Sequence, residues 1–203
     1  MKLRHLEMTL QRLTGYSNPC AALEQYQTPA TLAARLLYHA HMKGDIEGKS
    51  VGDLGCGTGV LAIGAALLGA EKVTGIDIDP KAIESAEANA MMLGAEVGFR
   101  LADVRDAELS GHIDFFDTVV MNPPFGAQTA HADRPFIDRA LSIAPVTYSI
   151  FNAGSVQFIE TYIAGRADID ERIRGVFPLR RTFSFHTRDI QEIEVEILRL
   201  IRK

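Results

Sequence analysis

The stretch Asp53-Leu54-Gly55-Cys56-Gly57-Thr58-Gly59 decides the fold of this 203-residue chain. It stands where a short apolar run, residues 51–54, gives way to a helical stretch over residues 59–69. In doubly wound α/β sheets this junction binds nucleotides, because its glycines let a ligand approach the backbone closely. The spacing is G-x-G-x-G, whereas a dinucleotide loop needs G-x-G-x-x-G and a P-loop needs a following lysine. The sequence therefore disfavours an NAD-linked oxidoreductase.

Short β-rich runs alternate with helical stretches from Lys49 onward, which is typical of a parallel α/β sheet. Two helices are expected before it, over residues 1–13 and from Thr28 to Gly44, with Thr28 as N-cap and Pro29 as first helical residue. The last run alternates isoleucine and valine with glutamate over residues 192–197, which predicts a half-buried strand and an antiparallel end to the sheet. We expect a single domain over residues 1–203, with residues 1–45 as an N-terminal helical extension.

Composition and charge narrow the class of protein. The formal net charge of −5 argues against nucleic-acid binding through overall positive charge, although a local basic patch stays open. Cys20 and Cys56 are too few for a disulfide framework or a structural zinc site, and His39 and His41 point to different helix faces. We expect no metal. The longest apolar run, Gly59 to Ala70, is too short to span a bilayer and no signal peptide is present, so a cytoplasmic location is expected.

Acidic residues follow the second and third expected strands. Asp77 ends the run KVTGID, where a carboxylate can accept hydrogen bonds from both ribose hydroxyls. Asp79 precedes Pro80, and its expected role is to cap the following helix. Asp103 ends the third run, where it can accept from an adenine amine while the Val104 amide meets a ring nitrogen. As an isolated residue, Asp103 would pass for a surface carboxylate.

A second motif, Asn122-Pro123-Pro124-Phe125, follows the expected fourth strand, FFDTVVM, which lies beside the first at the switch in strand order. An exocyclic adenine amine is a poor nucleophile because its lone pair is delocalised into the ring. The Asn122 side-chain oxygen and the Pro123 carbonyl can each accept one N–H, which turns the lone pair toward an electrophile. The prolines stiffen the turn, and Phe125 offers a face for a flipped-out base. Without the glycine loop, this tetrapeptide would be an ordinary turn.

The segments DLGCGTG, GIDID, LADV and MNPPFG, with Leu23-Glu24-Gln25-Tyr26-Gln27-Thr28-Pro29 upstream, resemble the class I adenine-N6 methyltransferases over nearly the whole chain. The chain is especially similar to the methyltransferase-like protein 5 family and its archaeal relatives, which modify an adenosine in small-subunit ribosomal RNA. The resemblance implies a Rossmann-like, seven-stranded sheet in the order 3-2-1-4-5-7-6 with the last strand antiparallel. It implies S-adenosyl-L-methionine as cofactor and residues 122–125 as the catalytic loop.

The resemblance also implies which residues form the cofactor pocket, to which the N-terminal extension contributes. The residues that it implies are Gln25, Thr28, Gly55, Thr58, Val60, Asp77, Asp103 and Val104. The glycine loop adds Asp53, Gly57 and Gly59 to the expected cofactor-binding set. In the family, a small zinc-binding activator protein pairs with an edge strand of the enzyme. The run VGFRLADV is the candidate edge, because the expected strand order leaves it unpaired on one side.

One local basic stripe stands out in the acidic chain, between Arg172 and Arg188. It holds five arginines and His186 without an acidic residue, and it includes Phe177, Phe183 and Phe185. Arginines and aromatic rings together suit phosphate contacts and base stacking. A solvated hairpin with core phenylalanines explains the same pattern, and no single RNA contact is assigned.

Three alternative functions remain open at this stage. A protein glutamine-N5 methyltransferase faces the same lone-pair problem with a similar loop, but such enzymes usually carry tyrosine at the Phe125 position and a larger N-terminal helical domain. A DNA adenine-N6 methyltransferase commonly needs a separate target-recognition domain, for which the chain has no room. A non-catalytic cofactor-binding scaffold is disfavoured by the intact Asn-Pro-Pro-Phe loop.

Overall fold

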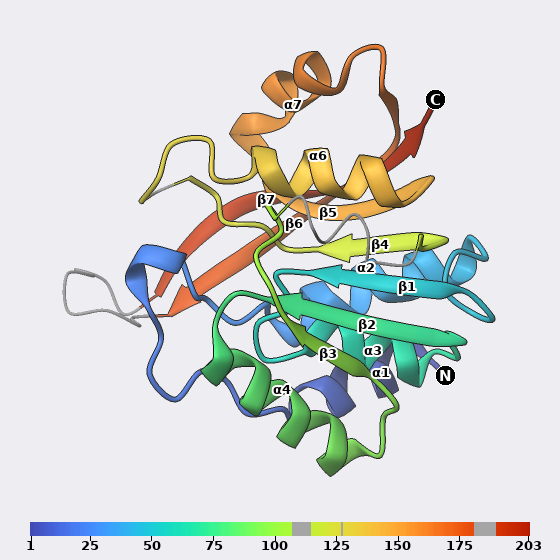
Figure 1. Ribbon diagram of the computed structural model, residues 1–203, viewed down its shortest axis with the longest axis vertical. Helices are drawn as coiled ribbons and strands as arrows, with labels where there is room; N and C mark the ends of the chain where they lie inside the picture. Colours follow the sequence, from blue (N-terminus) through green and yellow to red (C-terminus); the bar gives the residue numbers. More distant parts are fainter. Residues whose placement is uncertain (107–114, 127, 181–189) are drawn as a thin grey trace.

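The structure is a computed structural model, and it describes residues 1–106, 115–126, 128–180 and 190–203. The strands are β1 Ser50–Leu54, β2 Lys72–Asp77, β3 Gly98–Leu101, β4 Thr118–Met121, β5 Val146–Asn152, β6 Ala167–Arg180 and β7 Ile190–Arg202. They form one sheet in the order β3-β2-β1-β4-β5-β7-β6 (Figure 1). β7 runs antiparallel to both β5 and β6, whereas the other pairings are parallel. The predicted strand order and antiparallel last strand are confirmed.

Helices cover both faces of this sheet (Figure 1). They are α1 Leu3–Leu10, α2 Ala30–Met42, α3 Val60–Leu67, α4 Pro80–Leu93, α6 Arg134–Ile143 and α7 Val156–Ile163, with short 3₁₀ turns at Ala21–Leu23 and Ala153–Ser155. The first three helices pack together and share one core with the sheet, around Leu36, Ile63 and Val120. On the other face, α6 and α7 bury Ile137 and Ile159 in a second core.

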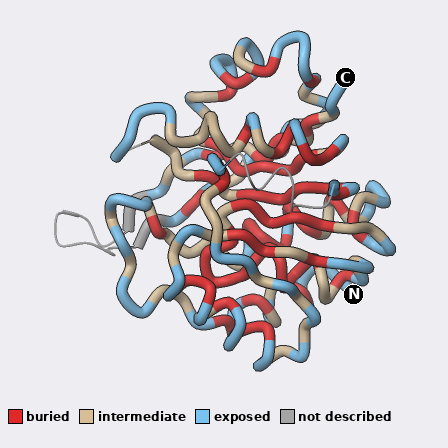
Figure 2. Tube along the Cα trace, viewed as in Figure 1, coloured by how far each residue is buried: buried red, intermediate tan, exposed pale blue. Residues whose placement is uncertain are grey.

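Burial follows the position of each strand in the sheet. The central strand β4 is buried at every residue, and Figure 2 shows the buried segments running through the middle of the molecule. In β7, Val195 and Ile197 are buried while Glu192 and Glu194 are exposed, which confirms the predicted half-buried strand. The alternation ends at Leu198, because the second core covers the opposite face there. Of the helices in the described part of the chain, none is long and apolar enough to cross a bilayer.

Two helix starts test the capping predictions. Asp79 is the N-cap of α4, and its Oδ1 accepts from the Lys81 amide at 3.0 Å, as predicted. The prediction for Thr28 is wrong. α2 begins at Ala30 with Pro29 as N-cap, because the ψ of 134° at Pro29 keeps that residue extended, and no side chain caps the helix. The Thr28 hydroxyl instead faces the Asn-Pro-Pro-Phe loop.

Candidate active site

A cavity of about 660 Å³ lies over the carboxyl ends of β1, β2 and β4. The strand order changes direction between β1 and β4, so the cavity lies at the topological switch point of the sheet. This volume is ordinary for a small-molecule site, and the place is where doubly wound sheets bind ligands. Most of the predicted residues line it, namely Gln25, Thr28, Asp53, Gly55, Thr58, Val60, Asp77, Asp103, Val104, Asn122, Pro123, Pro124 and Phe125. The fold therefore brings the two sequence motifs to one space.

Gly57 and Gly59 are absent from the cavity wall and serve the backbone of the glycine loop. Gly55, Gly57 and Gly59 have φ angles of 69°, 54° and 85°, in the left-handed region that favours glycine. Behind Gly57, the hydroxyl of Tyr16 lies 2.1 Å from where a Cβ would stand. A side chain at Gly57 would thus be strained and would also collide with Tyr16.

Asp53 is buried beneath the glycine loop, at 1% exposure. Its Oδ2 accepts from the Ala62 amide at 2.9 Å, whereas its buried Oδ1 has no hydrogen-bond partner among the described residues. Burial raises the pKa of Asp53 to about 8. A buried carboxylate oxygen without a donor is costly, and a ligand with a positively charged ammonium would satisfy it. The α-ammonium of S-adenosyl-L-methionine is such a group.

Asp77 holds the glycine loop from the second strand. Its Oδ2 accepts from the Gly57 amide at 2.8 Å, and its Oδ1 accepts from the Asp79 amide at 2.9 Å. Burial raises the pKa of Asp77. Each carboxylate oxygen carries a second lone pair, so hydrogen bonds from two ribose hydroxyls remain feasible beside these contacts. Asp77 is thus suited both to shape the loop and to bind a sugar.

Gln25 lines the cavity, and both ends of its side-chain amide bond to protein groups. Its Nε2 donates to Asp79 Oδ2 at 2.7 Å, and its Oε1 accepts from the Cys20 amide at 2.7 Å. This pair of bonds ties the N-terminal segment to the start of α4. In this arrangement Gln25 positions the cavity wall.

Asp103 and Val104 form the wall beyond β3. The guanidinium and amide of Arg105 donate to the Asp103 carboxylate, and these bonds lower its pKa. The carboxylate is therefore ionised at neutral pH and can accept a further hydrogen bond. Val104 is buried, and its carbonyl accepts from Arg139 Nε at 2.9 Å.

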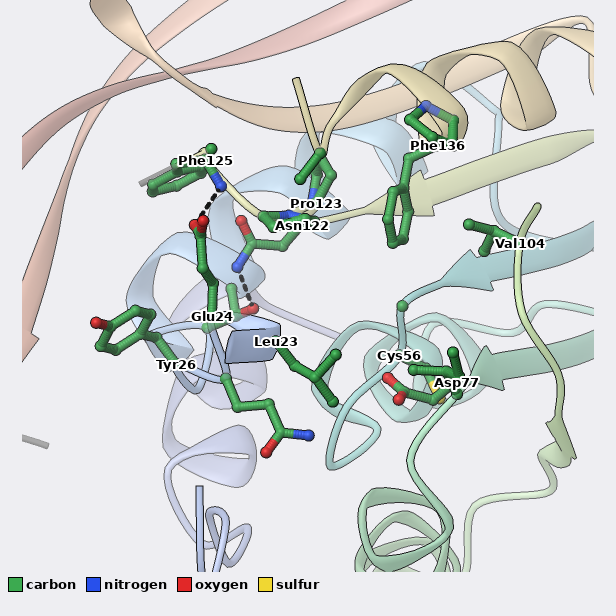
Figure 3. A pocket seen from close by; sticks show the side chains of 18 of the residues that line it. Leu23, Glu24, Tyr26, Cys56, Asp77, Val104, Asn122, Pro123, Phe125 and Phe136 are labelled. Atoms are coloured by element: carbon green, nitrogen blue, oxygen red, sulfur yellow. Dashed lines mark hydrogen bonds between the residues drawn. The ribbon is translucent and has the colours of Figure 1, made fainter. Parts of the chain in front are cut away.

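Asn122 stands at the carboxyl end of β4 with its amide held in one orientation (Figure 3). Its Nδ2 donates to Thr28 Oγ1 at 3.0 Å, and its buried Oδ1 has no partner among the described residues. The donor end is thus used inside the protein, while the acceptor end is left for a ligand. As at Asp53, a buried acceptor without a donor is costly, and a ligand that donates a hydrogen bond would satisfy it. At Asn122, however, the acceptor is a neutral amide oxygen.

Glu24 was not predicted, although it lies in the quoted segment LEQYQTP. It adopts the left-handed region, at φ 51°. Its carboxylate accepts from the amides of Phe125 and Gln128, both at 2.8 Å, and thereby fixes the backbone after the two prolines (Figure 3). Only the tertiary structure reveals this role, because Glu24 is about one hundred residues from its partners. Tyr16 and Phe136 are further cavity residues that no local pattern indicated.

The basic stripe is only partly described. Residues 181–189, which include Arg181, Phe183, Phe185, His186 and Arg188, lie outside the described residues. Arg172 pairs with Glu160 at 2.9 Å. Phe177 is buried at 2% exposure and meets Phe125 edge to face, with ring centroids 5.7 Å apart. Of the two explanations for the stripe, Phe177 fits the one with core phenylalanines, because its buried ring packs behind the Asn-Pro-Pro-Phe loop.

The sheet order, the antiparallel β7 and the two motifs at neighbouring strand ends define a class I S-adenosylmethionine-dependent methyltransferase. Residues 31–122 match the family model described as ribosomal protein L11 methyltransferase, PrmA. Over nearly its whole length the chain is 35% identical to rRNA N(6)-adenosine-methyltransferase Mettl5 of Drosophila melanogaster, across 98% of this chain and 96% of that protein. The corresponding METTL5 of Danio rerio is 34% identical, with 98% of each chain covered. The chain belongs to the family of rRNA N(6)-adenosine-methyltransferases that includes Mettl5.

Solved structures agree with this assignment. A protein from Pyrococcus horikoshii, described as a candidate RNA methyltransferase, superposes with a TM-score of 0.91 at 37% identity, over 100% of this chain and 98% of that one. Magnesium protoporphyrin IX methyltransferase of Synechocystis, solved with bound S-adenosylmethionine, shares the fold at 20% identity and a TM-score of 0.64, over 84% and 78% of the two chains. The fold is thus common to several methyltransferases, whereas the RNA-modifying relatives named above share 34–37% identity over nearly the whole chain.

Proposed function

We propose that the protein transfers a methyl group from S-adenosyl-L-methionine to the exocyclic N6 of an adenosine in small-subunit ribosomal RNA. The observation that carries the proposal is the buried Oδ1 of Asn122, which has no hydrogen-bond partner in residues 1–106, 115–126, 128–180 and 190–203, while the Nδ2 of the same amide donates to Thr28. An acceptor that is buried and free suits a ligand that brings an N–H group into the cavity. The family to which the chain belongs supports adenosine as that ligand.

The chain's own residues would prepare the amine for reaction. Asn122 Oδ1 and the Pro123 carbonyl accept the two N–H groups of N6 and turn its lone pair out of conjugation. Glu24 keeps the Phe125 backbone in place, and Phe177 supports the Phe125 ring, which offers a face to the flipped-out base. No general base is needed before transfer, and one N6 proton leaves to solvent afterwards.

The cofactor end of the cavity would be formed by the residues that carry negative charge. Asp53 Oδ1 would accept from the α-ammonium, Asp77 from the ribose hydroxyls and Asp103 from the adenine amine. Gly55, Thr58 and Val60 would line the methionine and ribose side. S-adenosyl-L-methionine, when bound there, supplies a methyl group made electrophilic by its sulfonium.

Further proposals concern the context of the reaction. We propose that residues 1–45 form one domain with the rest of the chain and close the cofactor pocket through Gln25 and Thr28, and that the protein acts in the cytoplasm. A small zinc-binding activator protein would pair with β3, whose described residues pair only with β2. Near this edge, Leu101 and Met92 are 58% and 46% exposed, which offers a partner apolar surface.

The test uses purified protein with radiolabelled S-adenosyl-L-methionine. Small-subunit ribosomal RNA, genomic DNA and a release-factor protein are incubated in separate reactions, each with and without the activator, and Asn122→Ala is the matched control. We expect label only in the RNA, recovered as N6-methyladenosine after digestion and absent in the variant. Label in DNA would overturn the proposal in favour of a DNA adenine-N6 methyltransferase. Label in protein glutamine would favour a glutamine-N5 methyltransferase. If the protein binds the cofactor tightly but transfers no methyl group even with the activator present, it is a non-catalytic cofactor-binding scaffold.

A further inference from the structure

A row of stacked aromatic rings begins at the wall of the cavity and continues along α7. The rings are those of His131, Phe158 and Tyr162, which we name the aromatic ladder. The centroids of His131 and Phe158 are 6.3 Å apart with planes 28° from parallel, and those of Phe158 and Tyr162 are 5.6 Å apart at 26°. His131 lines the cavity in the segment that follows the Asn-Pro-Pro-Phe loop. The ladder is therefore continuous with the place where the target base would enter.

The ladder remains accessible and is held in an unusual backbone conformation. Phe158 is 38% exposed, although it is a large apolar side chain, and His131 is also exposed. His131 has a φ of 66°, a left-handed conformation that non-glycine residues rarely adopt and that is concentrated at functional sites. Phe158 and Tyr162 are four residues apart on α7, so the helix presents both rings on one side.

Two guanidinium groups lie against these rings. Arg134 is 4.8 Å from the Phe158 centroid and 5.4 Å from that of Tyr162, and Arg166 is 4.9 Å from Tyr162. Arg166 is paired with Asp138 at 2.7 Å. Arg134 has no carboxylate partner in the part of the chain that the structure describes, and its buried Nε has no hydrogen-bond partner there. Its positive charge is thus available to an anion beside the ladder.

We propose that the aromatic ladder and Arg134 bind the RNA strand next to the target adenosine. A neighbouring base stacks on His131, the exposed ring at the cavity end of the ladder, which Phe158 supports from behind, and Arg134 donates to the adjoining phosphate. This inference rests on the proposed function for its ligand, since it assumes that RNA delivers the target base. Flat rings beside a guanidinium that has no carboxylate partner in the described part of the chain are the combination by which single-stranded nucleic acid is held. Because the chain carries a net charge of −5 and as a whole repels phosphate, RNA binding requires local positive charge such as that of Arg134.

Direct binding tests the ladder separately from catalysis. Fluorescence anisotropy with a short, fluorescein-labelled single-stranded RNA compares the full-length protein with Phe158→Leu, which keeps apolar volume and removes the ring against which His131 stacks. We expect binding to weaken about ten-fold in Phe158→Leu and to return in Phe158→Trp. The matched control is Phe115→Leu, since Phe115 is 75% exposed but stands before β4, at the opposite ends of the strands from the cavity.

A second variant tests the charge. Arg134→Gln should make the slope of log affinity against log salt concentration less steep, by the amount that corresponds to about one phosphate contact. Loss of a purely structural residue would leave this slope unchanged. S-adenosyl-L-methionine affinity and the thermal midpoint of each variant report whether the fold is intact. If Phe158→Leu and Arg134→Gln bind RNA as the wild type does, the inference is overturned, whether or not RNA is methylated. If the wild type methylates no RNA but the variants bind it more weakly, the proposed function fails and the ladder stands.

Discussion

The two ends of the cavity hold their free acceptors in opposite electrostatic settings. Under β1 and β2, the acceptors are the carboxylates of Asp53 and Asp77, and burial raises the pKa of both. Beyond β4, the acceptor without a partner among the described residues is the neutral amide oxygen of Asn122, which is followed by two prolines and by Phe125, whose ring packs on Phe177. A charged acceptor suits a cation or a hydroxyl that must stay bound. A neutral one suits an amine that must be turned and then released.

The comparison also shows how one segment serves both ends. Residues 14–28 cross from the glycine loop to the Asn-Pro-Pro-Phe loop, with Gln25 bonded to Asp79 and Thr28 bonded to Asn122. From the same segment, Glu24 accepts from the backbone amides of Phe125 and Gln128. The N-terminal extension therefore couples the glycine-loop end of the cavity to the Asn-Pro-Pro-Phe end. Under the proposed function, variants at each end should separate cofactor affinity from turnover.

The largest effect is expected for Asn122→Ala. Loss of the neutral acceptor should lower kcat for RNA by about 100- to 1000-fold, the usual result of removing one preorganised hydrogen-bonding group from a reacting centre. Cofactor affinity, measured by calorimetric titration, should stay within the error of the wild type. A loss of cofactor affinity as large as the loss of kcat would break the division between the two ends.

Asp77→Asn is expected to act at the other end. An asparagine cannot accept from both the Gly57 and Asp79 amides, because its Nδ2 would face one of them. Cofactor affinity should fall by about 10- to 100-fold, in keeping with the loss of hydrogen bonds to a charged group. At saturating cofactor, kcat should change little. A variant with unchanged calorimetric affinity and lowered kcat would contradict the assignment of Asp77 to the cofactor end.

Thr28→Val sharpens the comparison, because it removes one hydrogen bond and keeps the shape of the side chain. Without the hydroxyl, the Asn122 amide loses the acceptor that fixes its orientation, so kcat should fall about five-fold. Thr28→Ser retains the hydroxyl and is the matched control, expected near the wild-type rate. Equal rates for the valine and serine variants would show that the hydrogen bond does not orient Asn122.

The smallest effect concerns the pH dependence of stability. Burial raises the pKa of Asp53 from 3.8 to about 8, so without ligand the native state binds a proton that the unfolded state has released. The stabilisation is complete below pH 3.8 and is lost as the pH rises through about 8. Thermal midpoints of the wild type should therefore fall by a few degrees more than those of Asp53→Asn between about pH 5.5 and about pH 8. Added S-adenosyl-L-methionine should reduce that difference, since an ammonium near Oδ1 favours the ionised carboxylate. Parallel pH profiles of the two proteins, without ligand, would refute the role of burial at Asp53.

The full strand order was expected from the family resemblance, whereas the residue pattern alone predicted the fold class, the antiparallel end of the sheet and the two loops that meet at the cavity. These features depend on local chemistry: glycine at left-handed φ angles, proline after a strand, and hydrophobic periodicity. Asp79 as the α4 cap was equally readable, because a cap and its amide partner are two residues apart. The tertiary structure alone decided what Thr28, Glu24 and Phe177 do. Thr28 looks like a helix cap and Phe177 like part of a basic stripe until residues about fifty to one hundred positions away are brought beside them. Which of several possible hydrogen bonds or packing contacts a side chain makes depends on the nearest partners in space, and chain folding sets those partners without leaving a local pattern.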